Sequence, residues 1–468
     1  MTEHPAAAGS GEASDAARLP LTLRQHDDIL FWRGAEPVTC AQFLSHVAEA
    51  AEALPPRRHA INLCQDRYRF LVGFAAALVR GQVSLLSSDR SPHRLRQLAD
   101  RYPDAYVLHD DSDCAATAAA SSGVEHVVVA PVRLPRPTES GTPPAVPSIP
   151  GEQIAAIVFT SGSTGEPVGN VKPWAALVAC TLAASERFGF GGPGTRAVVG
   201  TVPPQHMYGF ETTILMLLHA SVSSYAGSTF FPHDVEQALS LVPAPRVLVT
   251  TPVHLRALLA ASPTLPPVER IISATAPLSQ EAAREAETVW RTEVHEIFGA
   301  TEVGSIASRR TVAGDLWRAY RGVSLDASGT RIFVSVPHLP SPVELHDHAS
   351  LSGQDGFRLL GRKSDIVKIA GKRASLSGLN KILNDIDGVE DGVFFLPDDL
   401  DTRPGARLLA FVVAPSRSSD EILAALRQRL EAPFLPRRVV MVDALPRNPV
   451  GKLTRRALLD LDTRPLAS

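Results

Sequence analysis

Cysteine is scarce in this chain of 468 residues, which contains four of them in all. Cys40, Cys64, Cys114 and Cys180 are widely separated and form no CxxC pair. This spacing provides neither a disulfide framework nor the paired ligands of an ordinary structural zinc site. We therefore expect the protein to work in a reducing compartment, the cytoplasm.

Long hydrophobic runs and an excess of charge of either sign are also missing. The most apolar run, FLVGFAAALVRG from Phe70, is far too short to span a bilayer. The formal net charge is -3 and both signs are interspersed, so the composition does not attract nucleic acid or an anionic membrane. Residues 1–20 lack the basic and apolar segments of a signal peptide, and we expect a disordered tail there.

Segments typical of helices and strands alternate through most of the chain. Residues 39–54 have apolar side chains at helical spacing after a candidate cap, Thr39. Residues 59–64 and 105–110 have the composition of short buried strands. Such alternation predicts an α/β fold with a largely parallel sheet. The proline-rich residues 130–153 are expected to form a linker or a long surface excursion.

The length of the chain predicts two or three domains, because one hydrophobic core rarely fills so many residues. We place a large N-terminal domain of layered α/β subdomains at residues 21–362. Further strand segments follow it, with an amphipathic helix at residues 418–432. They predict a small α+β C-terminal domain at residues 363–468.

A loop rich in glycine, serine and threonine, TSGSTGEP at residues 160–167, follows the apolar strand segment IAAIVF. Successive backbone N–H groups and hydroxyls in such a loop can bind an anion such as a phosphate. The loop is not of the GxxxxGK[ST] type, because no lysine follows Gly165. A polar turn without a ligand is the alternative at this point.

Four further patches follow along the chain. They are SATAPLSQ (residues 273–280), EIFGATEVG (296–304), the segment 346–373 and LPRNPVGKLTRRAL (445–458). With the loop, and in this order, they resemble the motifs of the adenylate-forming superfamily. That superfamily includes acyl- and aryl-CoA synthetases, luciferases and the adenylation domains of peptide synthetases. The resemblance covers most of the chain after the N-terminal tail.

The resemblance implies an activity as well as a fold. It implies an enzyme with a mobile C-terminal lid that uses ATP and Mg²⁺ to join a carboxylate to AMP, releasing pyrophosphate. The acyl or aryl group then passes to the thiol of CoA or of the phosphopantetheine on an acyl carrier protein. The segments 163–174 and 203–211 are similar to those of stand-alone bacterial acyl- or aryl-CoA or acyl-carrier-protein ligases, including ligases of aryl-polyene or hydroxybenzoate-derived pigment pathways.

The resemblance also implies which residues bind the nucleotide. Thr301 would contact the α-phosphate, Glu302 would bind Mg²⁺, and Lys452 would neutralise the substrate carboxylate and the phosphate as they meet. The remaining residues are Thr160, Ser161, Gly162, Ser163, Thr164 and Gly165 at the phosphates, Ala274, Thr275, Phe298 and Gly299 at the adenine, Asp347 at the ribose, and Arg362 at the ribose or a phosphate.

Asp347 is assigned by its distance from the Gly361–Arg362 pair, with the turn DGF between them. A surface turn is the alternative for this segment. A metal site at His346 and His348 ranks below both, because no third ligand is apparent in the sequence.

The acyl-substrate pocket and the lid follow from the same resemblance. The pocket residues are His206 as a gate, Tyr208, Gly209 and Phe210 as walls, and Glu211, which could hold the ammonium group of an amino-acid substrate. The lid residues are Ser364 or Asp365 as the pivot, and Lys368, Gly371 and Arg373 on the path of the thiol.

The sequence departs from the pattern of the superfamily at three positions. Val168 stands where a lysine is usual, Ser364 occupies the hinge position, and SLSGLN replaces the glutamate that usually follows Arg373. Either Lys172 substitutes for the missing lysine or a charge there is dispensable. The alternative functions are adenylate formation alone, amino-acid activation, and a non-catalytic protein that binds nucleotide or carrier protein.

Overall fold

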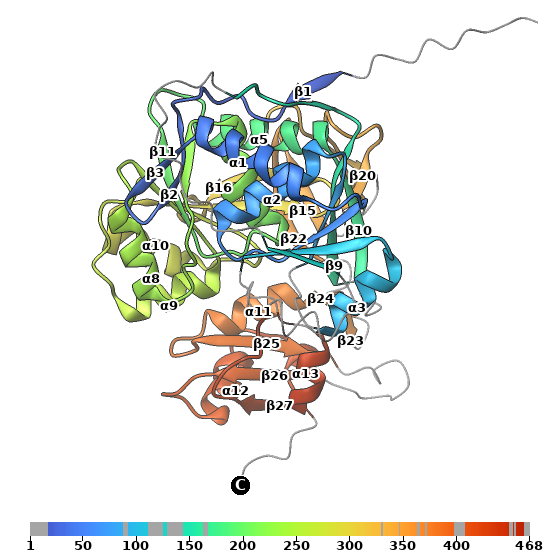
Figure 1. Ribbon diagram of the computed structural model, residues 1–468. Coiled ribbons are helices and arrows are strands. Elements are labelled where there is room, and N and C mark those ends of the chain that lie inside the picture. Colours follow the sequence, from blue (N-terminus) through green and yellow to red (C-terminus); the bar gives the residue numbers. More distant parts are fainter. Residues whose placement is uncertain are drawn as a thin grey trace, which may run out of the picture.

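The computed structural model describes residues 17–87, 92–110, 125–128, 144–161, 167–328, 331–345, 347–362, 366–369, 372–396, 408–448, 453 and 455–462 (Figure 1). The fold is α/β, as predicted, with a large N-terminal domain and a smaller C-terminal domain, which is drawn in orange and red. Among the described helices, none combines the length and the apolar character needed to cross a membrane.

A six-stranded sheet forms one layer of the large domain, and all its strands run parallel except β10. The strands predicted at residues 59–64 and 105–110 are β4 and β6 of this sheet. In spatial order its strands are β10 (Pro167–Pro173), β9 (Ile154–Ser161), β5 (Val83–Leu86), β4 (His59–Asn62), β6 (Ala105–His109) and β7 (Glu125–Val128).

An 11-stranded sheet forms a second layer. Its strands run parallel from β15 to β2, and antiparallel strands flank them on both sides. In spatial order they are β21 (Asp347–Ser352), β22 (Gly356–Arg362), β17 (Trp317–Ala319), β16 (Gly304–Arg310), β15 (Glu293–Ala300), β14 (Arg270–Ser273), β13 (Arg246–Thr250), β11 (Arg196–Gly200), β12 (Val222–Tyr225), β2 (Ile29–Arg33) and β3 (Glu36–Thr39).

Helices lie between these sheets and cover them. Helix α2 (Arg67–Val79) packs on β4 and β5, while α5 (Trp174–Phe188) contacts β10 of one sheet and β16 of the other. Helix α1 (Cys40–Ala53) begins at the predicted cap, because Thr39 and Gln42 form a capping box. The other helical segments of this domain are α3 (Pro92–Arg101), α6 (Met207–Phe210), the π-helix η1 (Glu211–Leu215), α7 (Met216–His219), α8 (Pro232–Leu241), α9 (Pro252–Ala261), α10 (Gln280–Trp290) and the 3₁₀ turn η2 (Thr311–Ala313).

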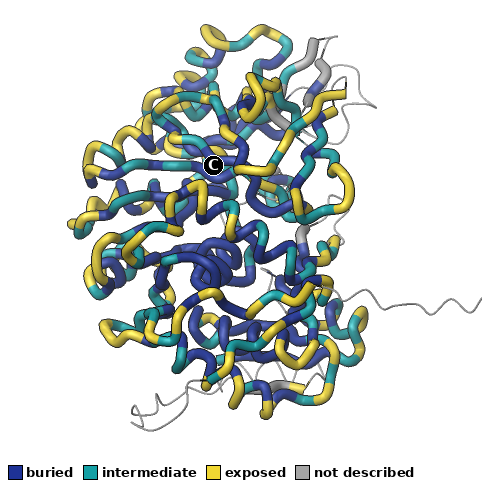
Figure 2. Tube along the Cα trace, turned by 90° about the horizontal axis from the view of Figure 1, so that it is seen from above, coloured by how far each residue is buried: buried dark blue, intermediate teal, exposed yellow. Residues whose placement is uncertain are grey.

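The interior of the large domain is apolar, and Figure 2 shows the buried segments running through its middle. Two smaller sheets complete the domain. They are the pair β1 (Arg18–Pro20) and β8 (Ser148–Pro150), and the three strands β18 (Ser324–Ser328), β19 (Arg331–Ser335) and β20 (Val343–Leu345). The end of the predicted tail at residue 20 is therefore wrong, because residues 18–20 pair with β8.

The C-terminal domain has its own apolar core, to which Leu383, Phe394 and Ile422 belong. The amphipathic helix predicted there is α12 (Ser419–Arg427), which begins with a capping box of Ser418 and Glu421. The other elements are β23 (Ile366–Ile369), β24 (Lys372–Ser375), α11 (Leu376–Asn384), β25 (Asp391–Phe395), β26 (Leu409–Val413), η5 (Ala432–Phe434), β27 (Arg438–Met441) and α13 (Arg455–Asp462). The predicted boundary after residue 362 falls beside residues that the structure does not describe, so it stays a prediction.

Candidate active site

The sequence EIFGATEVG forms the end of β15, a turn at residues 301–303, and the start of β16. The backbone is close-packed here: a Cβ on Gly299 would lie 2.3 Å from the carbonyl oxygen of Gly304. Gly304 has a φ of +84°, which favours glycine. This β15–β16 turn leaves Thr301 half-buried and the side chain of Glu302 exposed, so the carboxylate is accessible to a cation.

The carboxyl ends of three parallel strands lie at one edge of the 11-stranded sheet. His206 follows β11, Ala274 and Thr275 follow β14, and the β15–β16 turn follows β15. Open α/β sheets bind their ligands outside the carboxyl ends of such strands. The structure thus brings three of the predicted motifs together at one edge.

The residues predicted to border the adenine have unequal surroundings. Thr275 has a φ of 81°, which is rare for a β-branched residue and is found most often at functional positions. Ala274 is buried. The ring of Phe298 lies 5.6 Å from those of Trp317 and Phe357, measured between centroids. These two rings pack against Phe298, and its stacking on adenine stays a prediction.

Asp347, predicted at the ribose, and Arg362, predicted at the ribose or a phosphate, are neighbours in the structure. Asp347 begins β21 and pairs in register with Arg362, the last residue of β22. Asp347 is half-buried. The position inferred from spacing to the Gly361–Arg362 pair therefore lies directly beside that pair across the sheet.

The glycine-rich loop joins β9 to β10, two antiparallel strands whose last pair is Ser161 with Pro167. Val168 pairs with Thr160 and its side chain is 56% exposed. The structure describes the strands on both sides of the loop, and residues 162–166 lie outside the described residues.

Lys172 lies further along β10, in register with Ala156. Its side chain is buried, and its Nζ donates a hydrogen bond of 2.9 Å to the backbone carbonyl of Glu302. Burial lowers the pKa of Lys172, whereas Cys180 and the carboxylates of Glu302 and Glu211 act in the opposite direction. The ammonium therefore contacts the β15–β16 turn.

Several predicted residues fall outside the described part of the chain. Gly162, Ser163, Thr164, Gly165, His346, Ser364, Asp365, Gly371 and Lys452 lie outside it. The strands include Thr160, Ser161, Arg362, Lys368 and Arg373, of whose side chains nothing is described. The roles of all these residues stay predictions.

His206 caps the short helix α6, and its Nδ1 accepts a hydrogen bond of 3.3 Å from the backbone N–H of Tyr208. The Tyr208 hydroxyl donates to the carbonyl of Ile272 on β14 at 2.9 Å, which ties α6 to the neighbouring strand end. A Cβ on Gly209 would lie 2.2 Å from the carbonyl oxygen of Pro203, so glycine is required there. The predicted gate is therefore held at the same sheet edge as the β15–β16 turn.

Phe210, predicted as a pocket wall, belongs to the apolar core of the large domain. Its side chain is fully buried, with its ring centroid 6.0 Å from that of Phe70 and 5.0 Å from that of Phe74. Both partners belong to α2. These ring contacts pack α6 on α2, and the role of Phe210 as a pocket wall stays a prediction.

Glu211 is also buried, with 2% of its surface exposed. Its Oε2 accepts a 3.2 Å hydrogen bond from the backbone N–H of Ser305, and its Oε1 accepts another from the Ser305 hydroxyl. Burial raises the pKa of Glu211 to about 7, while these hydrogen bonds and the charge of Lys172 oppose the rise. The carboxyl group thus accepts two hydrogen bonds from Ser305, and its role toward a substrate ammonium stays a prediction.

Cys180 and His338 are site residues that sequence reasoning missed. Both contact the carbonyl oxygen of Val303, the thiol at 3.6 Å and the imidazole Nε2 at 3.2 Å, and they lie 3.3 Å from each other. Burial raises the pKa of Cys180 and lowers that of His338, so both are neutral at pH 7. They are far apart in sequence, in no recognisable motif, so only the tertiary structure reveals them.

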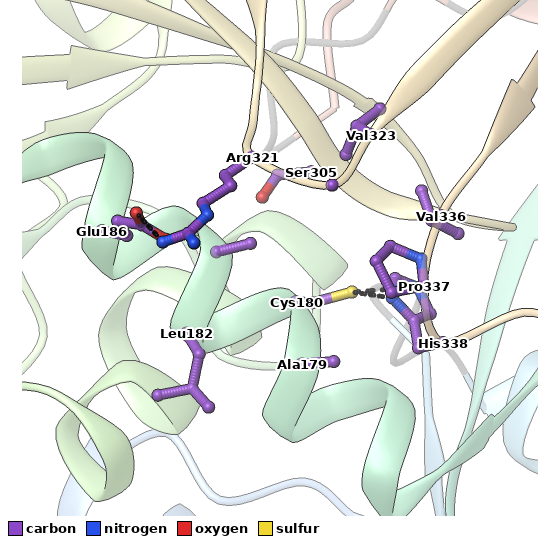
Figure 3. Close-up of a pocket in the computed structure, with 12 residues that line it drawn as sticks. Ala179, Cys180, Leu182, Glu186, Ser305, Arg321, Val323, Val336, Pro337 and His338 are labelled. Atoms are coloured by element: carbon purple, nitrogen blue, oxygen red, sulfur yellow. Dashed lines mark hydrogen bonds and ion pairs between the residues drawn. The ribbon is translucent and has the colours of Figure 1, made fainter.

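A cavity of about 320 Å³ lies behind the β15–β16 turn (Figure 3). Cys180, Ser305 and His338 supply polar atoms to it, and Glu186 and Arg321 form an exposed ion pair of 3.1 Å beside it. Figure 3 shows Cys180 and His338 pointing toward each other across one side of the cavity. The other lining residues are Ala179, Leu182, Ala183, Gly322, Val323, Val336 and Pro337.

Two family models match the chain. The model described as “AMP-binding enzyme” matches residues 22–336, and the one described as “AMP-binding enzyme C-terminal domain” matches residues 393–452.

Individual proteins are also similar to this chain. A 4-coumarate–CoA ligase of Rhodobacter capsulatus is 28% identical over 305 residues, which are 64% of this chain and 75% of the relative. A probable 2-succinylbenzoate–CoA ligase of Mycobacterium tuberculosis is 29% identical over 344 residues, covering 66% of this chain and 86% of the relative. The crystal structure of ATP-bound MatB from Rhodopseudomonas palustris has the same fold, with a TM-score of 0.79, 22% identity, and coverage of 94% of this chain and 96% of the other.

Proposed function

The chain belongs to the AMP-binding enzyme family, and we propose that it is an AMP-forming ligase that joins an aryl or acyl carboxylate to the thiol of CoA. The observation that carries the proposal is the meeting of His206, Thr275 and the β15–β16 turn at the carboxyl edge of one parallel sheet. The names of the similar ligases, which act on 4-coumarate and 2-succinylbenzoate, support CoA as the acceptor.

In the first half-reaction a carboxylate oxygen attacks the α-phosphorus of ATP, and pyrophosphate leaves. Because the carboxylate and the phosphates are both negatively charged, the protein's main tasks are to position them and to neutralise their charge. We assign Thr301 to the α-phosphate, Lys452 to the two meeting anions, and the loop at residues 160–165 to the β- and γ-phosphates. Asp347 binds the ribose and Arg362 the ribose or a phosphate, while Ala274, Thr275, Phe298 and Gly299 border the adenine.

Glu302 would hold Mg²⁺, which neutralises charge on the phosphates when it is bound. The carboxylate is exposed on the β15–β16 turn. The described residues contain no cluster of three or more His, Cys, Asp or Glu side chains suited to a metal. A single carboxylate fits Mg²⁺, because this ion commonly keeps waters and substrate phosphates as its other ligands.

In the second half-reaction the thiol attacks the acyl carbonyl, and AMP leaves. We assign residues 363–468 to a lid that rotates between the two steps about Ser364 or Asp365. Lys368, Gly371 and Arg373 then border the path of the thiol. The phosphopantetheine of an acyl carrier protein is the alternative acceptor, since it ends in the same thiol.

The acyl or aryl group occupies the cavity behind the turn. Ser305 connects the two regions, since it lines the cavity and bonds to Glu211, next to the wall residues of the predicted pocket. A volume of about 320 Å³ is near the lower end for small-molecule sites. Apolar walls with His338 and Ser305 as polar contacts suit an aromatic acid or a short acyl chain that carries a polar substituent.

The test is product analysis by mass spectrometry with ATP, Mg²⁺ and each of a panel of acids. The panel contains hydroxybenzoates, cinnamates, medium-chain fatty acids and amino acids. With CoA present we expect an acyl-CoA and AMP. A thioester formed only on a holo carrier protein would show that the carrier protein, and not CoA, is the acceptor. Accumulation of acyl-AMP with either thiol would reduce the function to adenylate formation. Binding of ATP without any AMP product would indicate a non-catalytic protein.

A further inference from the structure

Lys172 is a buried lysine that the assignments above do not use. It lies on β10, the edge strand of the six-stranded sheet, and only 5% of its surface is exposed. A buried ammonium group is costly unless hydrogen bonds and nearby negative groups offset its loss of water. Here its Nζ donates to the carbonyl oxygen of Glu302 at 2.9 Å. The lysine therefore ties one sheet to the catalytic edge of the other.

The rest of the turn is supported from the same side. The carbonyl oxygen of Val303 contacts His338 and Cys180, and the N–H of Ser305 donates to the carboxyl group of Glu211. These contacts and the Lys172 bond hold the inner backbone of the turn through buried side chains. Such support fixes the geometry of a site within the narrow range that catalysis requires.

Lys172 does not act from the position of the missing loop lysine. Val168, which occupies that position, lies four residues earlier on the same strand, which corresponds to about 13 Å at the rise of an extended chain. The Lys172 side chain is directed to the backbone of the turn. Its role is therefore distinct from direct neutralisation of the phosphates at the loop.

We propose that Lys172 is a positioning residue for adenylate formation, which holds the carbonyl of Glu302 and thereby fixes Thr301 and Glu302 toward the nucleotide. This proposal rests on the function proposed above, because it uses the roles of Thr301 and Glu302 in that reaction. It adds a residue on β10 that acts through the turn and touches neither substrate.

The test is Lys172→Met, which keeps the length of the stem and removes the ammonium donor. We expect the kcat of ATP–pyrophosphate exchange to fall about 10- to 100-fold, because small misplacements cost rates of this order. The KM for the carboxylic acid should stay within about two-fold, since its cavity is not altered. Thiolation of a supplied acyl-adenylate should also stay within about two-fold. Val171→Met is the matched control, since Val171 is the exposed neighbour on the same strand, and it should behave as wild type.

Two further variants keep the result interpretable. Lys172→Gln retains an N–H donor and should recover part of the lost exchange. If Lys172→Met fails to thiolate the supplied adenylate, Lys172→Gln takes its place in the comparison with wild type. Adding Val168→Lys to Lys172→Met should restore nothing. The proposal is overturned if Lys172→Met keeps wild-type exchange, if Lys172→Gln is no better than Met, or if Val168→Lys restores exchange. Failure of the proposed function itself would differ, since wild-type protein would then show no exchange.

Discussion

Glu211→Gln should change how the stability of the protein depends on pH. Glu211 is buried, and its pKa is about 7 in the folded protein against an ordinary value of 4.5. The difference corresponds to about 3 kcal/mol, at about 1.4 kcal/mol for each unit of pKa. The amide of glutamine has nearly the same shape but cannot ionise, so the variant avoids the free-energy cost of ionising a buried carboxyl group.

The sign follows from which state holds the proton. Below pH 4.5 the carboxyl group is protonated in both states, so it contributes no penalty. Between pH 4.5 and about 7 the unfolded chain releases the proton while the folded protein keeps it. The free energy of unfolding therefore falls as pH rises through this window, and levels off above it.

The assay is urea unfolding of the wild type and Glu211→Gln between pH 5 and pH 8. Because Gln lacks the ionisable group, the stability of wild type relative to the variant should fall by between about 2 and 3 kcal/mol across this range, since part of the effect is already present at pH 5. Glu186→Gln serves as the control, because Glu186 is an exposed carboxylate beside the same cavity. Parallel pH curves for wild type and Glu211→Gln would refute the raised pKa. A wild type that gains stability with rising pH would mean that attraction to Lys172 outweighs burial.

Three further substitutions test separate parts of the account. Gly209→Ala places a Cβ 2.2 Å from the Pro203 carbonyl, so we expect a loss of more than about 1 kcal/mol in thermal or urea unfolding; wild-type stability would contradict the close packing. Thr275→Gly removes the strain of a φ of 81° and should stabilise the fold by up to about 1 kcal/mol, whereas a clear destabilisation would mean that the threonine side chain holds the loop. Lys452→Ala should abolish adenylate formation but leave thiolation of a supplied adenylate nearly intact, and equal loss of both half-reactions would refute the separation of roles.

Local rules predicted the parts of the fold that depend on local sequence. The capping pattern at Thr39 and the apolar segments at residues 59–64 and 105–110 predicted α1, β4 and β6. Asp347, selected by its spacing, lies beside Arg362 because β21 and β22 pair there, and its role at the ribose stays a prediction. These features repeat over short stretches, so one sequence contains enough information to find them.

Contacts between distant segments could not be predicted in this way. Phe210 packs against Phe74, far away in the chain, and nothing in its motif indicates this contact. The role of Lys172 could not be decided from the sequence, because its partner, the carbonyl of Glu302, lies 130 positions further on. The bond between Glu211 and Ser305 spans 94 positions, and no periodic pattern encodes it. Such contacts depend on how the two sheets pack against each other in the tertiary structure.

The formation of an adenylate by this protein is tested by ATP–pyrophosphate exchange with the panel of carboxylic acids. We expect exchange that requires Mg²⁺ and one class of acid, strongest for aromatic or short acyl acids that fit the cavity behind the β15–β16 turn. Glu302→Gln should lower this exchange, because the variant removes the carboxylate assigned to the metal. Bound ATP with no exchange for any acid would contradict the claim that this protein forms an adenylate.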